Sequence, residues 1–182
     1  SHEVPLCLLE NSRGFNDYDY ALVHLFEKYE EYFDFYKTSL SQGRYVLLDN
    51  SLFELESIFD QDRFVYWIER LQPSSYIVPD SLENMGETIT SCENFLKKFK
   101  GVPGEKIGVV QGRNEQELID CYKFMSDNVD IIAISFDYSY YLTIADNYME
   151  GRIKFIQNLL EKNILNTEKA HHFLGCYLPQ EF

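Results

Sequence analysis

The sequence lacks the features that mark several common protein classes. None of its apolar runs reaches the roughly 18 residues that a membrane-spanning helix needs, so we expect no membrane association. Residues 1–3 do not resemble the start of a secretory signal peptide. Segments rich in Pro, or in Gly and Ser, are also missing, which predicts a chain that is folded throughout.

Glycine-rich loops and nucleophile motifs are absent as well. The segment "QGRNEQ", residues 111–116, has a single glycine, which argues against the phosphate-binding loop of a dinucleotide or nucleoside triphosphate site. No Gly-x-Ser-x-Gly nucleophile elbow occurs. His24, His171 and His172 stand at no recognisable metal-ligand spacing, so we expect no metal site in this chain.

Basic residues are scarce compared with acidic ones. The chain has 16 Lys and Arg against 30 Asp and Glu, a formal net charge of −14. Such a chain repels polyanions at long range, which argues against non-specific binding of nucleic acids. The lysines at positions 97, 98, 100 and 106 leave a local basic patch as an alternative, and their simpler interpretation is a solvated helix end.

Cysteines are few and widely spaced. They occupy positions 7, 92, 121 and 176, and no two form the Cys-x-x-Cys spacing of a zinc knuckle. The simplest interpretation is a set of reduced, buried cysteines in a cytoplasmic protein.

What is present is a regular alternation of β-rich runs with helical patterns. The expected strands are residues 4–10, 45–49, 75–80, 106–112, 129–137 and 171–176. The expected helices are residues 18–40, 61–71, 85 or 87 to 99, 114 onward, and 145–162. Asn114 is a candidate N-cap, with Glu117 three residues later in a capping-box pattern.

This order of elements implies parallel strands joined by right-handed crossovers. Two architectures fit it: an open, doubly wound sheet and a (β/α) barrel. Both place ligands at the carboxyl ends of the strands. The polar residues that end each apolar run are therefore the candidates for a functional site.

Almost every expected strand ends in a hydrogen-bonding group. These ends are Glu10-Asn11-Ser12, Asp49-Asn50, Asp80-Ser81, Gln111-Gly112, Ser135-Phe136-Asp137 and Gly175-Cys176. Each one alone is typical of a turn. Together on one rim they would form a polar basin suited to a flat heterocycle, because Asp accepts two N–H bonds from a guanine-like edge and Gln both donates and accepts. A second carboxylate could move a proton, and Phe53 and Phe136 could stack on a base or pack in the core.

Several of these ends resemble motifs of the tRNA-guanine transglycosylase (queuine tRNA-ribosyltransferase) superfamily. "DNSLFE", residues 49–54, resembles the family's Asp-Ser-Gly-Gly-Phe-Gln, and Asp80 in "YIVPD" resembles its second aspartate. "VVQG", residues 109–112, matches its Val-Gln-Gly strand end. Three further correspondences are "LLENS" with Leu-Gly-Asn-Thr, residues 135–137 with Gly-Gly-Leu, and "FLGCYLPQEF" with Leu-Met-Gly-Val-Gly-x-Pro-Glu-Asp.

The chain departs from the family where Ser51 and Leu52 replace one pair of glycines and Ser135 and Phe136 replace another. Both replacements would narrow the base-binding pocket of the family or change the residues at its rim. In this the chain looks more like phage and bacterial relatives that place 7-deazaguanines in DNA.

The resemblance implies a (β/α)8 TIM barrel, of which residues 1–182 would form one domain with about six of the eight βα units, incomplete at both ends. It implies that Asp49 is the catalytic general acid and base. It implies a base-binding set made of Asp80, Gln111, Gly112, Asn50, Ser135, Phe136, Leu174 and Gly175. The family's nucleophilic aspartate and its zinc cysteines would lie beyond Phe182, so no cofactor is expected within the chain.

The implied activity is that of a pentosyltransferase that replaces guanine in DNA or tRNA with a 7-deazaguanine. Its partners would be the base and the nucleic acid, in the cytoplasm of a bacterium or of a phage-infected cell. One alternative is a non-catalytic barrel subunit that binds a purine or 7-deazaguanine within a nucleic-acid modification complex. Another is an unrelated barrel or doubly wound domain whose strand-end acids only form turns. Open sheet edges would also favour homo- or hetero-oligomers.

Overall fold

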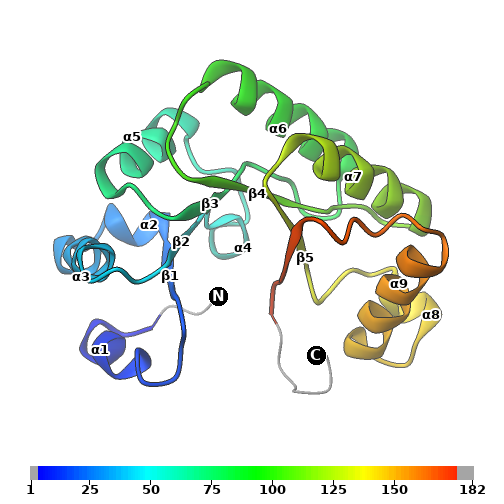
Figure 1. Ribbon diagram of the computed structural model, residues 1–182, viewed down its shortest axis with the longest axis horizontal. Helices are drawn as coiled ribbons and strands as arrows, with labels where there is room; N and C mark the ends of the chain where they lie inside the picture. Colours follow the sequence, from blue (N-terminus) through cyan, green and yellow to red (C-terminus); the bar gives the residue numbers. More distant parts are fainter. Residues whose placement is uncertain (1–3, 176–182) are drawn as a thin grey trace. The chain divides into compact units, whose positions relative to one another are not determined.

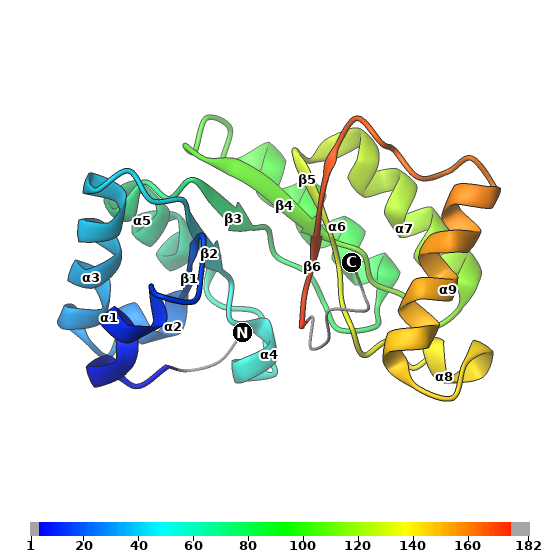
Figure 2. The same ribbon diagram turned by 60° about the horizontal axis from the view of Figure 1, so that its bottom comes forward.

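The computed structural model describes residues 4–175 and shows an α/β protein, drawn from two directions in Figure 1 and Figure 2. The chain divides into two compact units. Unit 1 comprises Ser1–Pro79 and Asn94–Lys106, and unit 2 comprises Asp80–Glu93 and Ile107–Phe182. Helix α6 (Met85–Lys98) and strand β4 (Glu105–Val109) contribute residues to both units.

Unit 1 is built around parallel strands. β1 (Asp19–Leu22) pairs with β2 (Val46–Asp49), and β2 pairs with β3 (Ser75–Ile77). Every residue of β2 and β3 is buried, as expected for parallel strands covered on both faces. The helical segments are η1 (Leu6–Leu8), α1 (Leu9–Ser12), α2 (Val23–Phe26), α3 (Glu30–Ser41), α4 (Leu52–Leu55) and α5 (Gln61–Leu71).

Unit 2 repeats this arrangement. β4 pairs in parallel with β5 (Ile131–Ile134), which pairs in parallel with β6 (Ala170–Phe173). The helices that connect or follow these strands are α7 (Glu115–Asn128), α8 (Tyr141–Ile144) and α9 (Tyr148–Glu161). In each unit the strand order follows the chain order, as in a (β/α) barrel, whereas a doubly wound sheet reverses its order at a switch point.

Local sequence signals explain where the helices begin. The carboxylate of Asp60 accepts a hydrogen bond from the backbone N–H of Arg63 at 2.8 Å and caps α5, whose bounds match the prediction. Asn114 caps α7 as predicted, because its Oδ1 accepts the backbone N–H of Glu117 at 3.0 Å. The Glu117 carboxylate accepts from the Asn114 side-chain amide at 2.8 Å and from the backbone N–H of Arg113 at 2.9 Å, so the returning bonds differ from those of the capping box that the sequence predicts. Within residues 4–175, no helix combines the length and the apolar character that a membrane crossing requires.

The prediction of a strand at residues 4–10 is wrong. Pro5 precedes the 3-10 turn η1, and the chain continues directly into α1. Only Leu9 of these two helical segments is buried, and Leu8 is 47% exposed. The run is apolar in composition but too exposed to be a central strand. The residues Glu10-Asn11-Ser12 are therefore not a strand end, and the correspondence of "LLENS" with the family's Leu-Gly-Asn-Thr strand end fails.

The prediction of one helix across residues 18–40 is also wrong. The first strand, β1, lies inside this segment, and α2 and α3 follow it. The aromatic residues at helical spacing lie in or beside α2 and α3. Because β1 directly precedes these helices, the helical spacing was read as including its four residues. The end of the first strand is therefore Leu22, and α2 follows directly with Val23 and the buried His24.

Two smaller differences concern the last expected helix and the cysteines. The helix expected at residues 145–162 begins at Tyr148, and a separate short helix, α8, precedes it. Cys92 and Cys121 are buried as expected, but Cys7 is exposed, contrary to the expectation of four buried cysteines. Cys176 and the remainder of "FLGCYLPQEF" after Gly175 lie outside the described residues.

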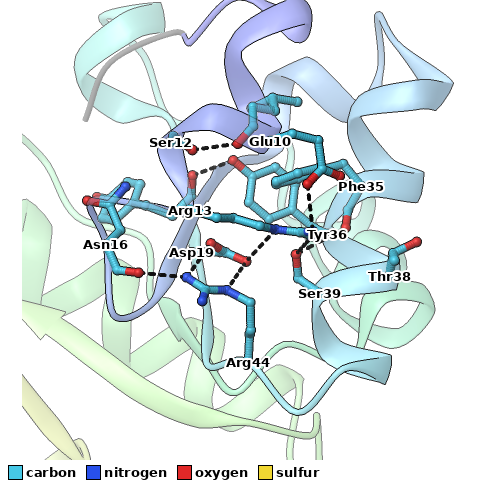
Figure 3. A network of polar contacts seen from close by, with 12 residues as sticks. Glu10, Ser12, Arg13, Asn16, Asp19, Phe35, Tyr36, Thr38, Ser39 and Arg44 are labelled. Carbon is cyan, nitrogen blue, oxygen red and sulfur yellow. Dashed lines mark hydrogen bonds and ion pairs between the residues drawn. The ribbon is translucent and has the colours of Figure 1, made fainter.

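A polar network joins the N-terminal segment to the amino end of β1 (Figure 3). The guanidinium of Arg44 donates to both carboxylate oxygens of Asp19, at 2.9 and 3.0 Å, and the Asp19 side chain is only 3% exposed. The guanidinium of Arg13 lies 3.9 Å from the same carboxylate, donates to Ser39 Oγ and stacks over the ring of Phe35. Asp19 thus holds α1, α3 and β2 together within unit 1.

Candidate functional site

The carboxylate of Asp49 ends β2 in unit 1 and is held at both oxygens. The hydroxyl of Tyr20 donates to Oδ2, and the backbone N–H of Ser51 donates to Oδ1. Asn50 makes a similar local turn, because its Oδ1 accepts from the N–H of Leu52 at 3.0 Å. Asp49 and Asn50 therefore do form turns through their side chains. If they also contact a ligand, they must do so in the orientation that these hydrogen bonds fix.

The loop after Asp49 has an unusual backbone. Ser51 takes a φ of 61°, in the left-handed region that favours glycine, and its hydroxyl accepts a hydrogen bond from the N–H of His24 at 3.3 Å. The amide of Asn50 donates to the carbonyl of Val78 at 3.0 Å, which ties the ends of β2 and β3 together. Phe53 is 59% exposed on α4, so it does not pack in the core.

Tyrosine hydroxyls surround this part of unit 1. Burial, and then the charge of Asp49, raise the pKa of Tyr20 well above its usual value. The hydroxyl of Tyr36 donates to the carbonyl of Tyr20 at 2.7 Å, and burial raises the pKa of Tyr32 to about 12. These hydroxyls remain protonated donors at neutral pH, so Tyr20 is a fixed hydrogen-bond donor to Asp49.

Asp80 and Gln111 meet in unit 2. Asp80 follows β3, Gln111 follows β4, and Gln111 Nε2 donates to Asp80 Oδ2 at 2.8 Å. Both residues are almost completely buried, at 3% and 2% exposure. A buried carboxylate next to a buried carboxamide provides acceptor and donor groups for a planar, hydrogen-bonding ligand.

Glu83 completes a chain of hydrogen bonds with these two residues. Its backbone N–H donates to Gln111 Oε1 at 2.8 Å, and its carboxylate accepts from the N–H of Ser139 at 2.5 Å. We call Asp80, Glu83, Gln111 and Ser139 the Gln111 cluster. The cluster links the segments that follow β3, β4 and β5.

Gly112, beside this cluster, has no room for a side chain. A Cβ at this position would lie 2.8 Å from the Cβ of Glu117 and 2.9 Å from the backbone nitrogen of Leu118. The glycine therefore allows the end of β4 to approach the first turn of α7 closely. The thiol of Cys121 on the same helix accepts the backbone N–H of Gln111 at 3.2 Å, and burial raises the pKa of this thiol to about 12.

The end of β5 forms a second group of expected site residues. The backbone N–H of Ser135 donates to the hydroxyl of Tyr138, which in turn donates to the carbonyl of Val110. The Ser135 hydroxyl donates to Asp137 at 2.7 Å. Tyr138 therefore connects the ends of β4 and β5.

Phe136 lies against the end of β6. Gly175 has a φ of 62°, and a Cβ there would lie 2.2 Å from the ring of Phe136. The backbone N–H of Leu174 donates to the carbonyl of Ile134 at 3.0 Å, and its carbonyl accepts from the buried guanidinium of Arg152 at 2.6 Å. The expected residues Phe136, Leu174 and Gly175 are thus gathered where β5 and β6 end.

The structure places the expected residues in two groups. Asp49 and Asn50 belong to unit 1, and the remaining seven expected residues belong to unit 2. That Asp49 shares a pocket with the unit 2 residues stays a prediction. Sequence reasoning missed Tyr20, Glu83, Tyr138 and Arg152. Of these, Glu83 could have been noticed as an acid just beyond the end of β3, while the others lie inside helical or turn patterns.

Among the described residues, no three His, Cys, Asp or Glu side chains are grouped so as to hold a metal ion. Comparison of the chain with models of protein families and with curated proteins finds no match.

Proposed function

We propose that this protein binds a guanine-type base, and that the binding serves an exchange of guanine in a nucleic acid for a 7-deazaguanine. The observation that carries the proposal is the buried hydrogen bond between Gln111 Nε2 and Asp80 Oδ2 at the ends of neighbouring segments of unit 2. These are the two residues that the resemblance to tRNA-guanine transglycosylases assigns to the base.

The chemistry of the pair suits such a ligand. A carboxylate accepts the paired N–H groups on the Watson–Crick edge of guanine, which a 7-deazaguanine retains. An amide N–H donates to the carbonyl oxygen of the same ring. Burial strengthens both interactions because little water competes for them.

The proposed exchange also needs an acid or base, a role that Asp49 would have. Ser51 supports the alignment of "DNSLFE" with the family motif, because it takes a φ of 61° at a position where the family has glycine. In the proposed enzyme Tyr20 would orient Asp49 through the hydroxyl that donates to it. A complete (β/α)8 barrel, and DNA as the polymer in preference to tRNA, are parts of this proposal.

A second candidate function is base binding without catalysis. Both oxygens of Asp49 already accept hydrogen bonds from Tyr20 and Ser51, as in a purely structural turn. The net charge of −14 also opposes the approach of a polyanion. In this case the protein would be a purine-binding subunit of a larger complex.

Calorimetric titration with 7-cyano-7-deazaguanine, guanine and adenine tests the shared part of both candidates. Binding of the first two bases without binding of adenine is the expected result. Equal binding of adenine, or no binding of any base, contradicts the proposal. An assay for release of labelled guanine from a DNA or tRNA substrate then separates the two candidates, and Asp49→Asn should abolish release only if the protein is the enzyme.

A further inference from the structure

Glu83 has a relationship to Gln111 that neither the sequence motifs nor the proposed function requires. Its backbone N–H lies 2.8 Å from Gln111 Oε1. An N–H group can only donate, so the Gln111 atom that faces it must be the oxygen. The amide nitrogen of Gln111 therefore faces the other way, toward the Asp80 carboxylate at 2.8 Å, which can only accept when ionised. The two contacts require the same orientation of the amide.

The backbone of Glu83 is held in a conformation that it would otherwise avoid. Its φ is 50°, in the left-handed region where residues with a Cβ are disfavoured by roughly 1–2 kcal/mol. The Glu83 carboxylate accepts the N–H of Ser139 at 2.5 Å, which fixes the loop after β3 to the segment after β5. A glycine would adopt this φ more easily, but it would lack the carboxylate that anchors the loop. The side chain thus supports the position from which the N–H reaches Gln111.

We propose that Glu83 is a positioning residue that locks the Gln111 amide with its nitrogen toward Asp80, and so makes the site prefer a base with a carbonyl at ring position 6 over one with an amino group there. This proposal rests on the proposed function, because it concerns the same site. With one N–H of Gln111 donated to Asp80 and Oε1 accepting from Glu83, the second N–H of Gln111 remains to donate to a ligand. A ring carbonyl can accept this hydrogen bond. A ring amino group would instead place its own N–H donors against the N–H of Gln111, and the hydrogen bond would be lost.

Three variants of the cluster test this inference. Glu83→Ala removes the carboxylate and keeps the backbone N–H. Glu83→Gln keeps an acceptor oxygen for Ser139 and is the conservative rescue. Ser139→Pro removes the opposite partner, the N–H of Ser139, at a position that tolerates proline because Tyr138 and Tyr141 close a turn in which Ser139 is the second residue.

The first measurement is made without ligand. The side-chain amide of Gln111 is assigned in the NMR spectrum of the ¹⁵N-labelled chain by comparison with Gln111→Leu, and the exchange of its two hydrogens with water is measured. We expect slow exchange in the wild type and in Glu83→Gln, and faster exchange in Glu83→Ala and Ser139→Pro. Unchanged exchange in both of the latter variants would overturn the positioning role.

The second measurement is the ratio of the affinities for 7-cyano-7-deazaguanine and for 7-deazaadenine. We expect Glu83→Ala and Ser139→Pro to lower this ratio by roughly 2- to 10-fold, the effect of one hydrogen bond, and Glu83→Gln to retain it. A purely structural role would weaken both ligands equally and leave the ratio unchanged, which would overturn the inference on specificity. A wild type that binds neither base would overturn the proposed function and the specificity, while the exchange measurement would still decide whether Glu83 orients Gln111.

Discussion

The side chain of Gln111 donates a hydrogen bond to the carboxylate of Asp80 across 31 positions of sequence, and both side chains are buried. A buried carboxylate requires compensating donors, so this contact stabilises unit 2 whether or not a ligand is present. The same contact places an acceptor beside a donor at the ends of β3 and β4. The proposed function depends on this pair more than on any other feature.

Replacing Asp80 with Asn should weaken the binding of a guanine-type base by about 1.5–3 kcal/mol. The change removes a negative acceptor but leaves an oxygen that can still accept from Gln111, so we expect the fold to survive. Calorimetric titration of wild type and variant measures the effect. Asp120→Asn on the exposed face of α7 is the control, since it makes the same charge change away from the cluster. Equal affinities in wild type and Asp80→Asn would remove Asp80 from the site.

Replacing Gly112 with Ala should lower the free energy of unfolding by about 1–3 kcal/mol, because its Cβ would meet the backbone of α7 at 2.9 Å. Urea denaturation followed by circular dichroism measures the change. Gly86→Ala on α6 is the matched control. A Cβ at Gly86 meets nothing closer than 3.9 Å, so this variant should be neutral or more stable by up to about 1 kcal/mol. The same loss of stability in both variants would contradict the close approach at Gly112.

The parallel strands from β2 onward were predictable because each lies in a short β-rich run bounded by turn residues. β1 was not, because its four residues stand next to aromatic residues at helical spacing in α2 and α3. The periodic pattern of a long neighbour overrides the weak signal of a four-residue strand. Only the structure reveals that residues 6–10 form helical turns in which Leu9 alone is buried.

The candidate site shows a similar division. Strand ends of a parallel sheet gather at one edge, so Asp80 and Gln111 could be singled out from sequence alone. The orientation of the Gln111 amide could not, because it depends on the backbone of Glu83, which no periodic pattern describes. Tyr20 was hidden by the wrong helix prediction for its segment, and with it the donor that holds Asp49.

Replacing Arg44 with Met should destabilise the protein by more than the loss of an exposed ion pair does. The change leaves the buried Asp19 carboxylate without the two hydrogen bonds that Arg44 donates. Thermal and urea unfolding measure the loss. Lys98→Met is the control, since the Lys98–Asp62 pair is 55% and 72% exposed and should contribute less than about 1 kcal/mol. A loss as small as that of the control would show that Asp19 does not hold unit 1 together.

Acid should destabilise the protein through His172, a residue of β6. Burial lowers the pKa of His172 to about 4, so the unfolded chain takes up the proton first as the pH falls. Stability is complete above pH 6.5 and is lost between pH 6.5 and 4, by about 3 kcal/mol for this residue.

Two measurements check this prediction. NMR titration of the histidine ring protons should show His172 protonated only near pH 4, and His172→Gln should remove the corresponding part of the acid sensitivity. Titration of His172 near pH 6.5, with the same acid sensitivity in wild type and variant, would contradict the prediction.

The most direct test of the proposed base site is an NMR titration of the ¹⁵N-labelled chain with 7-cyano-7-deazaguanine, in which the side-chain amide of Gln111 is followed. The proposal predicts that this resonance shifts with added base, that adenine leaves it unchanged, and that Asp80→Asn suppresses the shift. A Gln111 amide that does not respond at saturating base, or that responds equally to adenine, would contradict the assignment of a guanine-type base to the Asp80–Gln111 pair.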